Sequence, residues 1–211
     1  MKKGIYIIAA ISVALTLSSC GEEVVTENED EVEETICFYT YEDQSTTFEW
    51  TGYKTSSKIG VKGTFNEMTI SGDESSDDPI ALLESLTFSM TTASVETGDE
   101  GRNKKIAETF FGSMASPETI TGKVKELNDQ GVAIISVTMN GATADVEGEY
   151  TLVDGAFEFT STVDVSMWTA LASLEALHEL CVDLHTGDDG VSKTWTEVGL
   201  SFSTRLTSDC D

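Results

Sequence analysis

Apolar and polar side chains alternate in a series of short segments, and the clearest pair lies in residues 47–65. Phe48 and Trp50 fall on one side of an extended chain, because successive side chains of a strand point to opposite faces. After a polar loop the alternation returns and puts Gly63 and Phe65 on one face. The two segments predict a β-hairpin, and the mid-strand glycine indicates a bend or a group that approaches the backbone closely.

Turn residues separate the segments that follow. The pairs Asn140-Gly141 and Asp154-Gly155 are strong hairpin signals, because these residue types tolerate positive φ. A chain of 211 residues suits a single all-β domain, and we expect an antiparallel β-barrel built as a meander of about nine or ten strands. The predicted strands span residues 36–41, 47–54, 61–65, 83–92, 119–127, 132–139, 143–153, 156–165 and 194–206, with polar loops over 71–79 and 185–190.

Two stretches depart from the strand pattern. Ile106, Phe110 and Met114 recur at helical spacing within residues 102–114, and leucines recur in the same way within residues 167–180. We therefore expect two short helices, the first of which lies across an end of the barrel.

The N-terminus has the pattern of an export signal. Lys2 and Lys3 precede an apolar run over residues 5–17 that is too short to span a bilayer comfortably, and residues 17–20 resemble a bacterial lipobox that ends in Cys20. The prediction is a lipoprotein signal peptide over residues 1–19, with Cys20 acylated, palmitate included, as the membrane anchor. An ordinary signal peptide and a short transmembrane anchor are the alternatives.

An acidic segment follows the anchor. Eight of the 13 residues from Glu22 to Glu34 are acidic, so this segment cannot bury a core and residues 20–35 are expected to form a disordered tether. Its Gly-Glu-Glu start resembles export signals of some Bacteroidetes surface lipoproteins. We expect an outer-membrane lipoprotein, on the periplasmic face or the cell surface, with residues 36–211 as its folded domain.

The chain is strongly acidic. Its formal net charge of −26 repels nucleic acid, so no nucleic-acid partner is expected. The ordinary explanation for such a charge is the solubility of an exported domain.

Three cysteines remain if Cys20 carries lipid, namely Cys37, Cys181 and Cys210. The first and last strands of a closed antiparallel barrel are neighbours, which favours a Cys37–Cys210 disulfide and leaves Cys181 as a buried thiol. A Cys37–Cys181 bridge is the main alternative.

A series of motifs stands in order along the chain: Trp50-Thr51-Gly52-Tyr53-Lys54, Gly60-Val61-Lys62-Gly63-Thr64-Phe65, Ser94-Val95-Glu96-Thr97-Gly98 with Arg102 and Phe110-Phe111, Gly122-Lys123-Val124, and residues 184–195. Together these motifs resemble the YceI-like family over about residues 36–206. The resemblance implies an antiparallel, lipocalin-like barrel whose apolar interior holds a long isoprenoid chain, such as a polyprenyl phosphate or a quinone, without catalysis. Two positions depart from the usual pattern, Asn103 after Arg102 and the run Ala115-Ser116-Pro117.

The residues expected to line the interior are mostly aromatic and fall on the inward positions of the strands and helices. Lys54, Lys62 and Arg102 are candidates to contact a phosphate or carbonyl head at the rim. Ordinary core packing and solvated surface charges are the competing interpretations. The apolar candidates are Phe48, Trp50, Phe65, Phe88, Met90, Phe110, Phe111, Phe157, Phe159, Trp168 and Phe202.

Metal binding and catalysis find little support. Glu175, His178 and Glu179 share a helical face and His185 follows, but their spacing fits no standard metal motif, and hydrogen-bonded structural histidines are the simpler interpretation. We expect a non-catalytic lipid-binding protein with no metal or cofactor; homodimer formation is left open. The alternative function is a structural or interaction module whose barrel is filled by its own side chains.

Overall fold

The computed structural model describes residues 35–210, so the predicted signal peptide, Cys20 and nearly all of the predicted tether lie outside the described residues. Within the described residues, no helix is both long and apolar enough to span a bilayer. The strands are β1 (Cys37–Tyr41), β2 (Thr47–Lys54), β3 (Ile59–Phe65), β4 (Met68–Ser71), β5 (Thr87–Thr91), β6 (Val95–Glu96), β7 (Thr119–Leu127), β8 (Val132–Met139), β9 (Ala142–Val153), β10 (Ala156–Asp164) and β11 (Thr194–Cys210).

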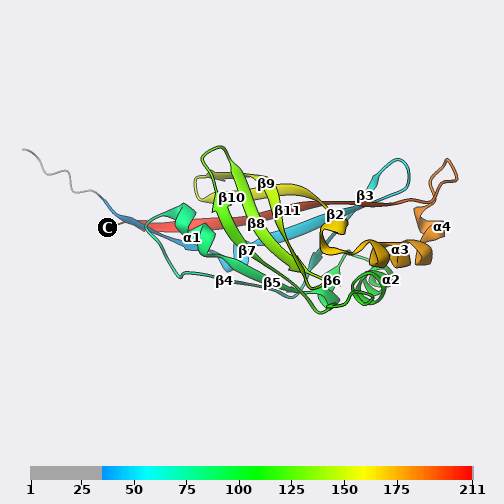
Figure 1. Cartoon of the computed structure of the whole chain (residues 1–211). Coiled ribbons are helices and arrows are strands. Elements are labelled where there is room, and N and C mark those ends of the chain that lie inside the picture. Colours follow the sequence, from blue (N-terminus) through cyan, green and yellow to red (C-terminus); the bar gives the residue numbers. More distant parts are fainter. Residues whose placement is uncertain (1–34, 211) are drawn as a thin grey trace, which may run out of the picture. The chain divides into compact units, whose positions relative to one another are not determined.

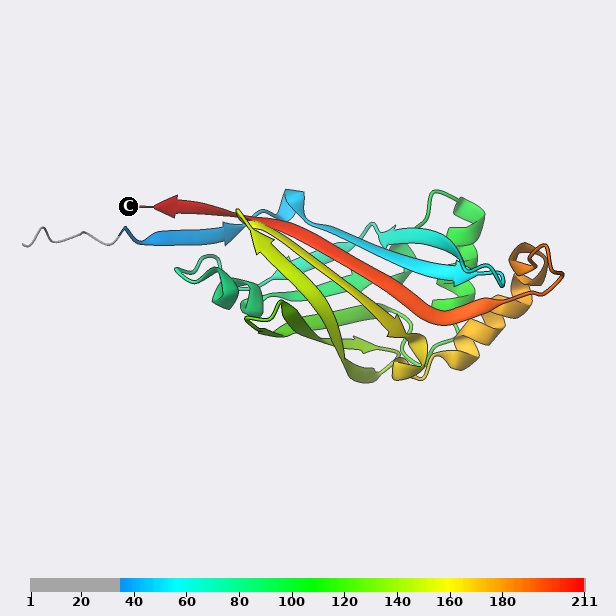
Figure 2. The same cartoon turned by 90° about the horizontal axis from the view of Figure 1, so that it is seen from above.

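The strands form one antiparallel sheet that curls into a barrel, which confirms the predicted fold class (Figures 1 and 2). The hydrogen-bonded order is β4-β5-β7-β8-β9-β10-β11-β2-β3-β6, a meander in which the last strand pairs with the first long one. The two ends of this order, β4 and the β3–β6 pair, meet at Asn66 and Glu67, which connect β3 to β4. The Asn66 amide donates to the Ser94 carbonyl after β5, and the Glu67 carbonyl accepts from the Thr91 amide at the end of β5.

The tight turns have the geometry that their sequences predict. Asn140 and Gly141 have φ of 53° and 71°, and Asp154 and Gly155 have φ of 50° and 77°. Positive φ at both central residues matches the right-handed twist of the flanking strands, so each pair makes a two-residue hairpin connection.

One helix occupies a segment predicted as loop and strand. Helix α1 spans Pro79–Ser85, so the strand expected over residues 83–92 begins only at Thr87. Asp78 caps the helix by accepting a hydrogen bond from the Ile80 amide at 2.8 Å, and proline at the first helical position fits the helical φ. The short strand β4 was also not predicted.

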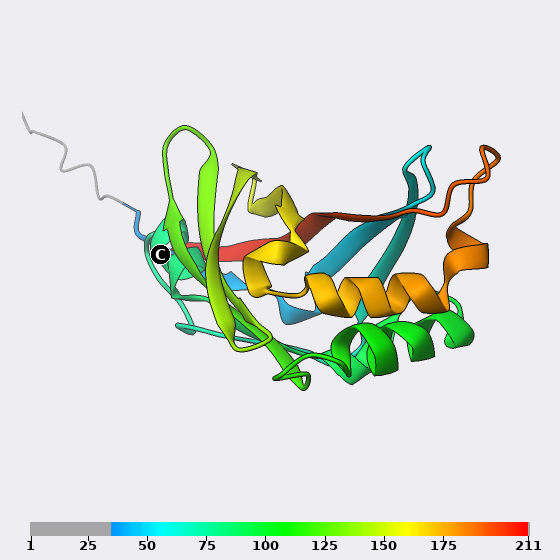
Figure 3. The same cartoon turned by 45° about the vertical axis from the view of Figure 1, so that its right-hand side comes forward.

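The two predicted helices are present with different bounds. The first is α2 (Glu100–Lys105), which continues as a π-helical turn η3 (Ile106–Phe111), and the second is α3 (Leu171–Leu180), followed by α4 (Val182–His185). Helix α3 packs against η3, and together they lie across the end of the barrel away from β1 (Figure 3). The remaining helical turns are η1 (Asp43–Ser45), η2 (Thr92–Ser94) and η4 (Val165–Trp168).

The other end of the barrel is closed by α1 and by a packed aromatic core. Leu82 and Leu83 of α1 are fully buried, and the ring of Phe157 lies 5.7 Å from Tyr150 and 6.2 Å from Phe202. Beyond this core, β1 pairs with the last residues of β11. The structure forms the Cys37–Cys210 disulfide there, one of the two pairings that the sequence left open, and Cys181 is a buried free thiol.

Candidate functional site

A largely apolar cavity of about 530 Å³ lies between the sheet and the helices at the end away from β1. Its volume falls in the range of pockets that bury small-molecule ligands. The strands supply most of the wall, and the helical segments α2, η3, η4, α3 and α4 supply most of the remainder. The apolar lining residues are Phe48, Trp50, Val61, Phe65, Phe88, Met90, Ile106, Phe110, Phe111, Ile120, Val137, Met139, Val163, Val165, Trp168, Leu174, Leu177, Cys181, Leu184, Trp195, Val198 and Leu200.

Glycines on inward positions give the large side chains their room. A Cβ at Gly63 would overlap the indole ring of Trp50, and a Cβ at Gly122 would overlap the ring of Phe88. The close approach that the mid-strand Gly63 indicated is thus the Trp50 ring lying over its backbone. With no side chain at these positions the rings lie flat against the wall.

Arg102 is held in a fixed position on the cavity wall. Its Nε donates to Thr97 Oγ1 at 2.9 Å and its Nη2 donates to the Thr97 carbonyl at 3.1 Å. Thr97 is itself fixed, because its hydroxyl and its amide donate to Asn103 Oδ1 at 2.6 and 2.9 Å. These bonds use part of the five-donor guanidinium and leave further N–H groups for a ligand.

Further charged groups surround the same part of the cavity. Lys54 of β2 and Lys105 of α2 line it, and Lys54 Nζ donates to the Leu184 carbonyl at 3.2 Å. Asp99 is the acidic group in the lining. It caps α2, and the hydrogen bond from the Arg102 amide lowers the pKa of Asp99, so its carboxylate is already engaged by the helix. This part of the lining therefore favours an acceptor or anionic group.

Two histidines share one hydroxyl at the cavity end. Nδ1 of His178 and Nδ1 of His185 lie 2.9 and 2.6 Å from Thr194 Oγ1. Burial, followed by the nearby charges of Lys54, His178 and Lys105, lowers the pKa of His185 from 6.5 to about 4. His185 is therefore neutral at physiological pH, and both imidazoles are hydrogen-bonded structural groups. No group of three His, Cys, Asp or Glu side chains within residues 35–210 is placed to hold a metal ion.

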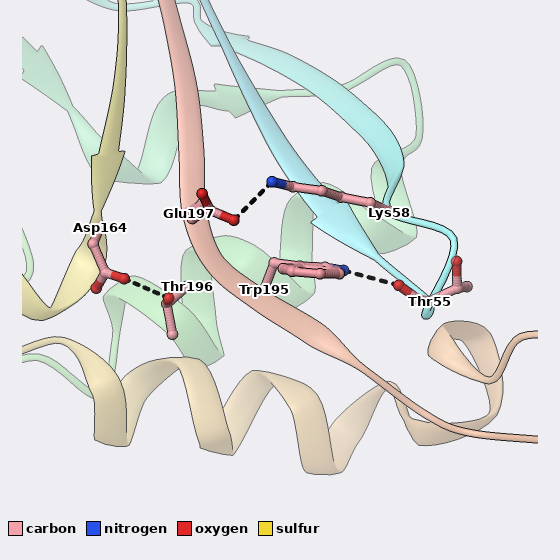
Figure 4. A network of polar contacts seen from close by, with 6 residues as sticks. All are labelled: Thr55, Lys58, Asp164, Trp195, Thr196 and Glu197. Carbon is pink, nitrogen blue, oxygen red and sulfur yellow. Dashed lines mark hydrogen bonds and ion pairs between the residues drawn. The ribbon is translucent and has the colours of Figure 1, made fainter.

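A bulge in β11 shapes the wall next to the histidines. The pairing of β11 with β2 shifts register between Thr194 and Val198, and the side chains in between fix neighbouring elements (Figure 4). This arrangement ties the start of β11 to the β2–β3 loop and to the end of β10. Trp195 Nε1 donates to the Thr55 carbonyl at 2.8 Å, Lys58 Nζ donates to Glu197 Oε2 at 2.7 Å, and Thr196 Oγ1 donates to Asp164 Oδ2 at 2.5 Å.

The structure brings most of the candidate residues together around the cavity. Three further candidates, Phe157, Phe159 and Phe202, point inward but pack at the closed end and do not line the cavity. Lys62 is also away from the cavity, since it is exposed and pairs with Glu49 at 2.7 Å. The candidates that line the cavity are Phe48, Trp50, Lys54, Phe65, Phe88, Met90, Arg102, Phe110, Phe111 and Trp168.

Several lining residues were not among the candidates, although their patterns carried a signal. Ile120, Val137 and Leu200 occupy inward positions of predicted strands, and Leu174 belongs to the leucine stripe of the predicted second helix. Lys105 lies three residues after Arg102, a spacing that puts both on one helix face. His185 had no such signal, because only the return of α4 towards β11 brings it to the cavity.

Comparison with known proteins gives one family and a shared fold. The family model described as YceI-like domain matches residues 39–205. A polyisoprenoid binding domain from Saccharophagus degradans, implicated in plant cell wall breakdown, matches with 14% identity and a TM-score of 0.56, over 81% of this chain and 98% of that one. BcnA of Burkholderia cenocepacia matches with 14% identity and a TM-score of 0.51, over 79% and 99%. At these identities the two structures show likeness of fold. The comparison with curated proteins found no match.

Proposed function

Because the chain belongs to the YceI-like domain family, we propose that its barrel binds one long isoprenoid lipid, of the polyprenyl phosphate or quinone type, and carries or sequesters it without catalysis. The observation that carries this proposal is the cavity of about 530 Å³ with its aromatic and aliphatic wall. The Saccharophagus degradans protein of similar fold is a polyisoprenoid binding domain, which supports the same ligand class for this chain.

The wall and the charged groups suit the two parts of such a lipid. Burial of an apolar chain contributes about 0.8 kcal/mol per CH₂, so ten methylenes correspond to roughly micromolar affinity before ordering costs. Arg102, Lys54 and Lys105 supply donors and positive charge for a phosphate or carbonyl head. These three cations in the cavity lining offset locally the repulsion that the net negative charge of the chain exerts on an anionic head.

The alternative function, an interaction module with a self-filled barrel, requires interdigitating side chains along the whole interior. Side chains fill the interior at the α1 end, where Phe157 and Phe159 are buried, but a continuous cavity occupies the other end. The cavity favours the lipid-binding function over this alternative.

The location follows from the sequence and is part of the proposal. Acylation of Cys20 would anchor the protein in the outer membrane, and residues 20–35 would tether the barrel to it. The described chain enters the barrel at the β1 end, whereas the cavity lies under α2 and α3 at the other end (Figure 1).

A cavity-blocking substitution tests the proposed function. Val137 points into the cavity from β8, and its neighbour Ser136 lies on the outer face of the same strand. Val137→Trp should lower the affinity for a geranylgeranyl-bearing lipid at least tenfold by filling the space that the chain occupies, whereas Ser136→Trp should leave it near the wild-type value. Equal effects of the two variants, measured by native mass spectrometry on folded protein, would contradict lipid binding in this cavity.

A further inference from the structure

The indole N–H of Trp50 has no hydrogen-bond partner. Among the buried side-chain nitrogen and oxygen atoms of the described residues, Trp50 Nε1 is the one without a partner. The other two tryptophans of the chain are satisfied, since Nε1 of Trp168 donates to the Val137 carbonyl at 2.9 Å and Nε1 of Trp195 donates to the Thr55 carbonyl. A buried donor without a partner is costly, so an unpaired one on a cavity wall indicates an acceptor that the protein itself does not supply.

The position of this N–H is built by the sheet. The ring of Trp50 lies over Gly63 on the neighbouring strand, with Cε2, the carbon bonded to Nε1, next to the glycine backbone. Thr97 Cγ2 flanks the same point. The Trp50 ring and Thr97 therefore approach the same point on Gly63, and Thr97 also holds the guanidinium of Arg102.

We propose that the indole N–H of Trp50 donates a hydrogen bond to an oxygen of the bound lipid, so that the cavity selects isoprenoids that carry an acceptor oxygen over plain hydrocarbons. This inference rests on the proposed lipid-binding function. Neighbouring side chains cover Nε1 in this structure, so the hydrogen bond requires the indole ring to move relative to Gly63 when the lipid enters the cavity. A phosphate ester and a quinone carbonyl both supply the acceptor, and Arg102, as a cation, adds a preference for the phosphate.

The chemistry of the wall supports an oxygen of the lipid rather than a water molecule as the partner. A buried water is retained where two to four polar groups surround it. The side chains around Trp50 on the cavity wall are largely apolar, with Phe48 and Phe65 on the same and the neighbouring strand. An oxygen that is covalently part of an apolar chain brings the acceptor into these surroundings without the need for further polar partners.

Indole resonances test the hydrogen bond directly. The protein from Thr35 onward, which contains the whole described fold and its disulfide, is labelled with ¹⁵N and titrated with geranylgeranyl phosphate, a menaquinone with a geranylgeranyl side chain, or squalene. The Trp50 indole proton should move downfield with the first two lipids but not with squalene, whereas the Trp168 and Trp195 indoles, already bonded within the protein, should move little. An equal shift of the Trp50 indole with all three lipids, or no shift on binding of the oxygen-bearing ones, would overturn the inference.

A pair of variants gives the energetic test. Trp50→Phe removes the N–H and keeps an aromatic ring, so the ratio of the affinity for geranylgeranyl phosphate to that for squalene should fall about tenfold. Trp168→Phe is the matched control, since Trp168 lines the same cavity: the substitution should weaken the binding of both lipids by similar factors and keep the ratio. It should also lower the stability of the lipid-free protein, because the Val137 carbonyl loses its donor, whereas Trp50→Phe should not. An unchanged ratio in Trp50→Phe would contradict the proposal.

A third variant and the binding data separate the possible failures. Arg102→Gln should weaken the binding of geranylgeranyl phosphate more than the binding of the menaquinone, because the substitution removes the positive charge that favours a phosphate head. Failure of all three lipids to bind wild-type protein, seen by native mass spectrometry, would overturn the proposed function and this inference together. Tight binding of squalene with no preference for oxygen would retain the proposed function and overturn only the role of Trp50.

Discussion

His185 is a residue whose protonation the fold controls. Burial lowers its pKa to about 4 in the folded protein, against 6.5 for the free side chain. Between these values the unfolded chain binds a proton that the folded chain does not, so the free energy of unfolding should fall as the pH drops from about 6.5 to about 4. Because the side chain is half-buried, we expect a loss of about 1–2 kcal/mol, discounted for solvent screening.

Denaturant unfolding of the wild type and His185→Gln across this pH range measures the contribution of His185. The glutamine does not titrate and can hydrogen-bond to Thr194, so the difference in unfolding free energy between the two proteins should change within the window and be constant above pH 7. A difference that is independent of pH would show that His185 titrates normally.

Gly63 is the residue on which the position of the Trp50 ring depends. Gly63→Ala would place a methyl group in the space of the ring and beside Thr97, and should lower the free energy of unfolding by about 1–3 kcal/mol. Gly52→Ala is the control, because its Cβ would lie 3.6 Å from the nearest ring atom, an ordinary contact. Chemical denaturation compares the two, and equal losses would contradict the close packing described.

Residue patterns predicted which side chains face inward better than they predicted what those side chains contact. Phe157 and Phe202 were correctly placed inside by alternation, yet they pack at the closed end. Alternation has a period of two and specifies the face of a strand, whereas the height of a residue within the barrel depends on the register with its neighbours. The register is defined only by the pairing of two strands, so the pattern of a single strand does not predict it.

At the level of helices, strands and turns, the sequence predicted an element correctly where a few adjacent residues determine its structure. The hairpins at Asn140-Gly141 and Asp154-Gly155 were predictable because two residues determine the turn. Helix α1 carried a signal in Asp78-Pro79, but the alternation of Leu86, Phe88 and Met90 favoured a strand over residues 83–92, so the predicted start of that strand was wrong. Strand β6 has two residues, too few for any periodicity.

The Cys37–Cys210 disulfide links strand β1 covalently to the end of β11, with which it pairs. The bridge closes a loop with a sequence separation of 173 residues, and its removal should cost about 2–5 kcal/mol of unfolding free energy, because the unfolded chain gains freedom. Equilibrium unfolding of the Cys37→Ser and Cys210→Ser double variant measures this cost. Cys181→Ala is the control, since it removes a thiol but no cross-link and should retain the response of the wild type to reductant.

For the molecule as a whole, the pattern of residues predicted the meander of strands, but it did not by itself distinguish a hollow interior from a filled one. Short turns between successive strands favour a meander, and its closure makes β11 a neighbour of β2. A filled barrel and a hollow one have the same inward alternation, so the expectation of a lipid-holding interior depended mainly on the resemblance to the YceI-like family. Gly63 and Gly122 leave room for the rings of Trp50 and Phe88, and η3 and α3 cover the space that remains between them and the sheet.

Native mass spectrometry of the protein from Thr35 onward, purified without detergent, would decide whether this cavity holds an isoprenoid lipid. We expect a discrete adduct that organic extraction releases as a polyprenyl or quinone species. A protein of unmodified mass that stays unchanged after incubation with such lipids would contradict lipid binding and favour an interaction module instead.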